Sequence, residues 1–103
     1  MIRNPKHLAF IRALSCCKCG AGHNIQAAHI RKGTDGGTAV KPSDCYTVPL
    51  CHECHAEQHR VGEVTFFKNI DRAREFALSL YMNTGNYNAA LLRIVRFKNA
   101  LHR

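Results

Sequence analysis

Hydrophobic residues recur at helical spacing close to the start of the chain. Leu8, Ile11 and Leu14 fall on one side of a helix, and an asparagine suited to an N-cap and a proline suited to a first turn stand just before them. The pattern therefore predicts a short amphipathic helix over residues 4–15.

The positions that follow indicate two short strands. Residues 25–31 and residues 45–50 are mainly apolar runs, and between them lie the glycine-rich stretch 32–38 and a turn marked by Pro42 and Asp44. We expect the two runs to pair as a hairpin with a long tip.

The second half of the chain has helical periodicity. Residues 51–60 have helical spacing, and Gly62 is placed to end that helix. Further apolar patterns predict a short helix over 63–69 and longer helices over 71–83 and 88–102. The residues expected on the packed sides of these three helices are Val64, Phe66, Phe67, Ala73, Phe76, Ala77, Leu80, Tyr81, Leu91, Ile94, Val95 and Leu101, with Lys98 beside the last of them.

Length and charge limit the classes of protein to consider. The chain has 103 residues, the size of one domain, and the elements favour a single α+β domain over residues 1–103. Fifteen Lys and Arg against seven Asp and Glu give 15 − 7 = +8, and the pI is about 9.5. A polyanion is therefore the first partner to expect, and nucleic acid is the commonest one. Aromatic residues are only 8% of the chain and are not clustered, which argues against RNA recognition by base stacking.

The N-terminal segment helps to predict the cellular compartment of the protein, and with it the redox state of the six cysteines. The apolar run there is broken by His7 and Arg12 and does not match a secretory signal, and no run approaches the length of a membrane span. We therefore expect a cytoplasmic protein with reduced thiols and no membrane partner. In that setting the cysteines indicate metal ligands, and the alternative is a small secreted disulfide scaffold.

Four of the cysteines form two C-x2-C pairs, which are typical of structural zinc sites. Thirty-one residues separate the pairs, more than in a compact zinc ribbon, so the site must straddle the predicted hairpin. The four expected zinc ligands are Cys16, Cys19, Cys51 and Cys54.

The two remaining cysteines and one overlapping motif leave alternatives open. Cys17 could replace Cys16 as a ligand, and Cys45 is expected to be a small buried side chain. Residues 51–55 also contain C-x-x-C-H, the pattern of c-type haem attachment. The second C-x-x-C pair and the lack of an export signal favour zinc over haem.

Three histidines are candidates for a reaction centre. His55 and His59 are four residues apart and would share one face of a helix, where two imidazoles can bind one divalent ion. His29 lies on the first predicted strand, and it could face that ion across a gap and take a proton from water. The alternatives are a solvated or packed pair for the first two histidines and a core residue for the third.

Residues 28–59 resemble the HNH endonucleases, the ββα-metal nucleases, in the subset that has a zinc-knuckle frame. The matching segments are AHIR, then KPSD, then VPLCxxCHxxxH, and this combination looks particularly like small phage and prophage HNH proteins implicated in recombination. The similarity covers about residues 16–60, and residues 63–103 would form a helical extension. It implies a small ββα-metal core with a four-cysteine zinc site, flanked by an N-terminal helix and two or three C-terminal helices.

The resemblance also implies roles for individual residues. His29 matches the general base, His55 and His59 match the ligands of the catalytic ion, and the four paired cysteines match the structural zinc ligands. The implied activity is hydrolysis of a DNA phosphodiester that leaves a 5′ phosphate. The catalytic ion would be magnesium, manganese, nickel or zinc; two imidazoles suit the last three better, whereas the family commonly uses magnesium.

Basic residues near the motif are candidates for binding the DNA backbone. Arg31 or Arg60 could clamp a phosphate, because a guanidinium group matches phosphate geometry, and either could instead be a solvated charge. Lys32, at the start of the glycine-rich loop, could bring the backbone close to a phosphate.

The chain departs from the family pattern at two positions. Ala28 stands where many members have an aspartate or histidine ligand, and Tyr46 stands where the middle asparagine is usual. Asp44 is close enough to take over either task, as a ligand or by orienting His29. A non-catalytic, zinc-stabilised DNA-binding module is the alternative function, and a homodimer that cuts both strands is a possible assembly.

Overall fold

The computed structural model describes residues 1–102, which form an α+β domain with a two-stranded sheet and five α-helices. The predicted fold class is confirmed at this level. The elements in chain order are α1 (Pro5–Arg12), β1 (Ile25–His29), the 3-10 helix η1 (Asp44–Tyr46), β2 (Thr47–Cys51), α2 (His52–Val61), α3 (Glu63–Phe67), α4 (Ile70–Met82) and α5 (Tyr87–Leu101).

The two strands form the expected antiparallel hairpin. Ile25 pairs with Cys51 and His29 pairs with Thr47, so the strands are in register along their whole length. The second strand begins two residues later than predicted, because Cys45 belongs to η1 instead. The first strand ends at His29; the Ile30 amide still donates to the Tyr46 carbonyl at 2.8 Å, and the next two amides, of Arg31 and Lys32, bind the Glu63 side chain of α3.

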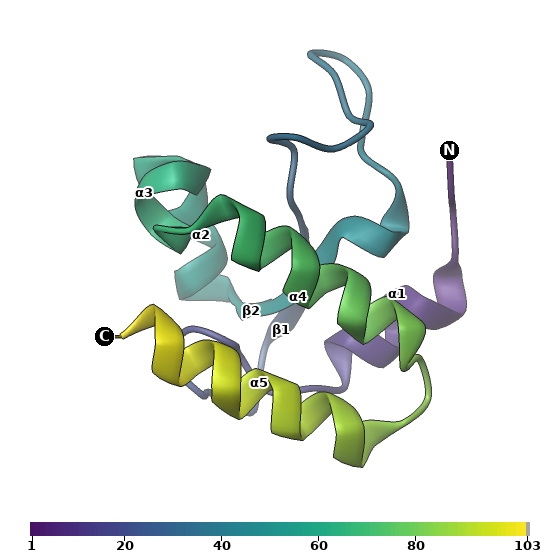
Figure 1. Ribbon diagram of the computed structural model, residues 1–103, viewed down its shortest axis with the longest axis vertical. Helices are drawn as coiled ribbons and strands as arrows, with labels where there is room; N and C mark the ends of the chain where they lie inside the picture. Colours follow the sequence, from purple (N-terminus) through teal and green to yellow (C-terminus); the bar gives the residue numbers. More distant parts are fainter. Residues whose placement is uncertain (103) are drawn as a thin grey trace.

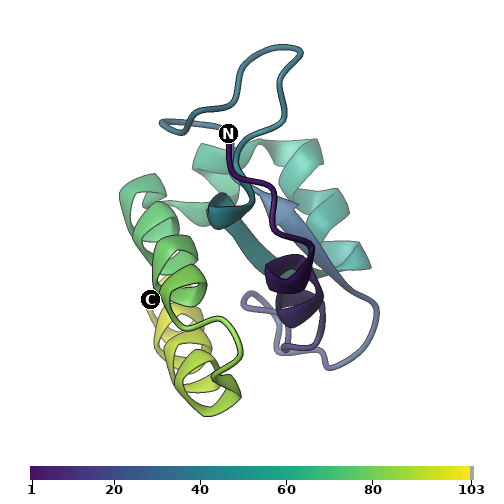
Figure 2. The ribbon, with the colours of Figure 1, turned by 90° about the vertical axis from the view of Figure 1, so that its right-hand side faces the viewer.

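The helices cover the hairpin on two sides. In Figure 2, α2 lies on one side of the strands and the pair α4 and α5 lies on the other. Both faces of β2 are therefore covered, and all five of its residues are buried. The long connection between the strands extends away from the body of the domain, at the top of Figure 1.

Helix α5 buries two of the residues predicted for its packed side, Ile94 and Leu101, but leaves two others exposed. Its buried residues include Ile94 and Phe97, whereas Leu91 is 42% exposed and Val95 is 54% exposed. The reason is the Phe97 ring, which stacks on Phe76 of α4 with centroids 4.2 Å apart and turns that side of α5 inward. The prediction for Leu91 and Val95 was wrong. That for Val64 in α3 was also wrong, since it is 49% exposed.

The first residues of the chain run along the end of the long loop. The Ser43 hydroxyl accepts a hydrogen bond from the backbone N–H of Ile2 at 2.8 Å, and the N–H of Asp44 donates to the carbonyl of Ile2 at 2.9 Å. The N–H of Asn4 donates to the Asp44 carboxylate at 2.7 Å. This strap fixes the turn from which Asp44 extends toward β1. Within residues 1–102, we find no helix with the length and apolar character needed to cross a membrane.

Candidate functional site

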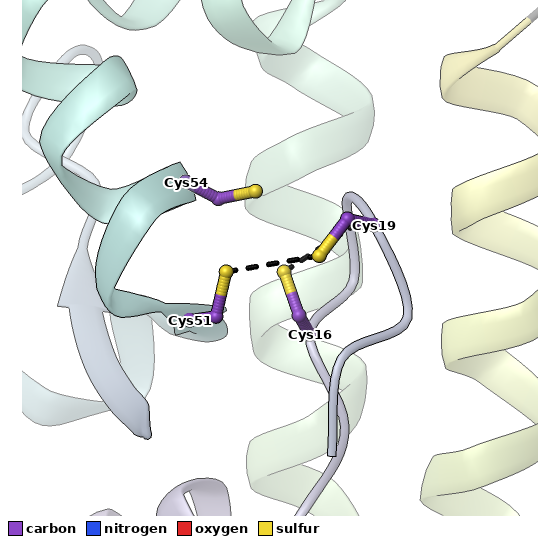
Figure 3. Close-up of side chains that lie close together, drawn as sticks. All are labelled: Cys16, Cys19, Cys51 and Cys54. Carbon is purple, nitrogen blue, oxygen red and sulfur yellow. Dashed lines mark hydrogen bonds between the residues drawn. The ribbon is translucent and has the colours of Figure 1, made fainter. Parts of the chain in front are cut away.

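The four paired cysteines come together at one end of the hairpin. Cys16 and Cys19 lie in the loop that follows α1, while Cys51 ends β2 and Cys54 lies in the first turn of α2 (Figure 3). Their four Sγ atoms lie within 4.8 Å of one another. The pairs are far apart in sequence, so the hairpin is the element that brings them together.

The geometry of this cluster fits a tetrahedral zinc ion. Zinc–thiolate bonds of about 2.3 Å place two sulfurs of a tetrahedral site about 3.8 Å apart. The Sγ atoms of Cys19 and Cys51 are 3.7 Å apart. Burial raises the pKa of the Cys16 thiol, but backbone hydrogen bonds at Cys19 and Cys51 outweigh that effect and lower the pKa to about 7. A thiol that ionises this readily suits a metal ligand. The four-cysteine cluster can therefore hold a structural zinc ion.

The structure also separates the ligands from the spare cysteines. Cys17 lies outside the cluster: its backbone N–H donates to the carbonyl of Pro49 at 3.0 Å, and burial raises the pKa of its thiol. Cys16 is therefore the ligand of that pair. Cys45 is buried and also lies outside the cluster, as expected.

A tight turn gives the first pair its shape. The N–H of Gly20 donates to the carbonyl of Cys16 at 2.9 Å, and the N–H of Cys19 points at the Cys16 sulfur 3.5 Å away. Gly20 has φ of +84°, a conformation that residues with a Cβ adopt only at a cost. The glycine after C-x2-C therefore lets the chain fold around a shared ion.

The three candidate histidines line one small cavity beside the hairpin. His29 is the last residue of β1, and His55 and His59 lie one turn apart on α2. The hairpin brings these two elements together, as the sequence predicted. The cavity measures about 180 Å³, and its lining residues are Ala27, His29, Arg31, Lys41, His55 and His59.

The hydrogen bonds of the α2 histidines leave nitrogen lone pairs for an ion. The Gln26 amide oxygen lies 2.6 Å from Nδ1 of His55, and because that oxygen only accepts, Nδ1 carries the proton and the lone pair of this ring is on Nε2. Nε2 of His59 lies 3.2 Å from Nε2 of His55. Two imidazole nitrogens about 2.1 Å from one ion would lie about 3 Å apart, so the pair has the right separation for a shared divalent ion. Sequence reasoning missed Gln26, which lies on β1, the strand that also carries His29.

His29 is oriented by Asp44. Nε2 of His29 lies 3.0 Å from the Asp44 carboxylate, which is 2% exposed and also accepts from the N–H of Asn4. A proton on Nε2 leaves the lone pair on Nδ1. Burial lowers the pKa of His29, and the carboxylate only partly offsets that, so the ring is neutral near pH 7. Of its two predicted roles, the geometry favours Asp44 as the group that orients His29.

The predicted phosphate-binding residues divide into two groups. Arg31 lines the histidine cavity, and its guanidinium donates to the Gly37 carbonyl at 3.1 Å, which holds the base of the loop. Lys32 lines a neighbouring cavity that also includes His29. Arg60 instead pairs with Glu57 at 2.6 Å on the exposed face of α2, and it lines neither cavity.

The two positions that depart from the HNH pattern, Ala28 and Tyr46, do not line the histidine cavity. Ala28 is fully buried in the core, opposite Val48, so it offers nothing to an ion in the cavity. Tyr46 lines a separate cavity next to Arg74 and Glu75.

A second and larger cavity adjoins the histidines. It measures about 360 Å³, and it shares His29, Arg31 and His59 with the smaller one. Two residues that sequence reasoning did not single out, Gln58 and Glu63, also line it. Gln58 is 2% exposed, and its side-chain oxygen has no hydrogen-bond partner among the described residues.

Comparison with known proteins gives a family but no activity. Searches of curated proteins and of solved structures find no significant match. A family model described as "Protein of unknown function (DUF968)" matches residues 1–69, a segment that contains the four clustered cysteines and the three cavity histidines. This match covers more than half of the chain, which therefore belongs to the DUF968 family.

Proposed function

We propose that this protein is a metal-dependent DNA endonuclease of the HNH type. The observation that carries the proposal is the shared cavity of His29, His55 and His59, in a chain of net charge +8. It unites a neutral imidazole suited to act as a base with a pair of nitrogens suited to bind an ion. The net charge favours a polyanionic substrate.

Each residue of the centre has a task in this proposal. His29 takes a proton from the attacking water through Nδ1, while the Asp44 carboxylate accepts a hydrogen bond from its Nε2–H. His55 and His59 hold the divalent ion, and Gln26 fixes the tautomer of His55. A bound magnesium, manganese, nickel or zinc ion supplies Lewis-acid stabilisation of the charge that develops on the phosphate. Arg31 and Lys32 bind the DNA backbone near the scissile bond.

The biological setting follows from the resemblance to phage and prophage proteins. We propose a role in the processing or recombination of phage DNA, and a second copy of the chain would supply the second cut in a duplex. The four-cysteine zinc site has a structural task in this account, because it anchors the start of the helix that carries both ion-binding histidines.

Plasmid cleavage tests the proposed activity. The wild-type protein should nick supercoiled DNA when magnesium, manganese or nickel is added, and His29→Ala should lower the rate by about 100-fold or more while DNA binding is unchanged. His23→Ala is the matched control, since His23 is exposed and lines neither histidine cavity. Failure of the wild type to cleave with any of these ions would refute the proposal.

A non-catalytic DNA-binding module is the second candidate. The buried methyl group of Ala28, where many HNH enzymes have a ligand, favours it. It predicts DNA binding that depends on zinc but is unchanged by His29→Ala, and no cleavage with any ion.

A further inference from the structure

A carboxylate binds two successive backbone amides at the edge of the larger cavity. The N–H of Arg31 donates to one oxygen of Glu63 at 2.8 Å, and the N–H of Lys32 donates to the other at 2.9 Å. The two amides follow the end of β1 after one intervening residue, Ile30, and Glu63 is the first residue of α3. The two backbone amides therefore act as a pair of donors that already bind a carboxylate of the same chain.

This amide pair lies beside the proposed reaction centre. Glu63, Lys32 and His29 line the same cavity of about 360 Å³. Gln58 lines it as well, and its buried side-chain oxygen has no hydrogen-bond partner among the described residues, which indicates that the cavity receives water or another donor. The site thus combines prepared amide donors with nearby positive charge.

The chemistry of the pair matches a phosphate group. Successive backbone N–H groups in a turn are a common way to bind the oxygens of phosphate, and the turn here continues into Gly33 with φ of +73°. A phosphodiester has two unesterified oxygens and one negative charge, as a carboxylate does. Glu63 therefore occupies the place and the donors that a backbone phosphate would use.

We propose that the Arg31–Lys32 amide pair is a phosphate-binding site for the nucleic-acid backbone, and that Glu63 occupies it until a phosphate replaces the carboxylate. Glu63 is only half-buried, so its side chain can rotate outward while α3 stays in place. The nucleic acid as ligand rests on the proposed function, whereas phosphate binding at these amides does not. The site would hold one phosphate of the nucleic acid beside His29, and only a phosphate that displaces the Glu63 carboxylate could bind there.

Amide NMR on the ¹⁵N-labelled, zinc-loaded full chain tests this directly. Wild type, Glu63→Gln and Glu63→Ala are titrated with inorganic phosphate and, separately, with a short DNA duplex, without any divalent ion beyond the structural zinc. In both variants we expect the signals of Arg31 and Lys32 to shift with phosphate, with a dissociation constant about tenfold lower than in wild type. Glu75→Gln is the control, because it removes one exposed negative charge that lies outside this cavity.

The possible results separate the proposal from its rivals. Equal strengthening in Glu75→Gln would show a general charge effect and overturn the site, as would phosphate shifts confined to other amides in all variants. Shifts with inorganic phosphate but not with DNA would overturn the nucleic-acid ligand. The wild-type protein tests the site without any substitution. Its Arg31 and Lys32 signals should also shift, but at a higher DNA concentration than in the Glu63 variants. Because no cleavage is measured, these results test the phosphate site separately from the nuclease proposal. Failure of one proposal does not imply failure of the other.

Discussion

Removal of the ion from the four-cysteine cluster should destabilise the whole domain. The cluster joins Cys16 to Cys51 and so closes a loop of 51 − 16 = 35 residues. A cross-link of that span lowers the free energy of folding by about 4 kcal/mol through chain entropy alone. A domain of this size has a total stability of about 5–15 kcal/mol, so the ion supplies a large part of it. At about 4–8 °C per kcal/mol, this loss should lower the melting temperature by about 16–32 °C.

Thermal unfolding with and without a strong chelator measures this loss. The protein as purified should contain one zinc ion per chain, and chelation should remove it together with the stability. Cys19→Ser should reproduce the effect, because it removes one ligand. Cys45→Ser is the matched control. Cys45 is buried but lies outside the cluster, so the zinc content of this variant should equal that of the wild type. A purified protein without bound metal, or a melting temperature that chelation leaves unchanged, would refute the reasoning.

Three further predictions concern single histidines. Gln26→Leu removes the acceptor that fixes the tautomer of His55, so calorimetry on the zinc-loaded protein should show nickel binding weakened by about tenfold with the structural zinc retained. Burial lowers the pKa of His29, so the pH at which the cleavage rate falls to half should lie below about 6.5, the ordinary value for histidine; a half-maximal rate at pH 7 or above would contradict this. Burial also lowers the pKa of His7, whose Nε2 has no hydrogen-bond partner within residues 1–102, so the unfolded state binds more protons and stability falls as the pH drops through about 6.5. His7→Phe should make the unfolding free energy less dependent on pH between about 7 and 5 in denaturant titrations, and an unchanged slope would exclude this role for His7.

Short sequence spacings predicted most of the site. The pairs Cys16–Cys19 and His55–His59 are three and four residues apart, so the local backbone decides how they face one another. The hairpin followed from two apolar runs, and its pairing brought His29 toward α2. These features depend on local geometry and one simple pairing, which a pattern of residues can encode.

The contacts that the sequence did not reveal join distant segments. Gln26 meets His55 across 29 residues, and Glu63 meets the Arg31 amide across 32. The strap that holds Asp44 joins residues 40 apart, from Asn4 to the carboxylate. No periodicity predicts such contacts, because each depends on how the packed elements finally meet.

The two wrong predictions on α5 have a different physical cause. Apolar residues lie all around this helix, so hydrophobic periodicity alone does not select one face. The choice is made by aromatic stacking of Phe97 on Phe76, which belongs to another helix. Leu91 and Val95 remain exposed as a result.

The ends of the cleaved DNA test the central claim most directly. Hydrolysis by a water that His29 activates, with the 3′ oxygen as leaving group, yields a 5′ phosphate and a 3′ hydroxyl. Nicked plasmid produced by the zinc-loaded protein with manganese should therefore be resealed by DNA ligase without other treatment, and His29→Ala should produce almost no nicks. Nicks that ligase does not reseal, or nicking that persists in His29→Ala, would contradict a hydrolytic centre built on this histidine.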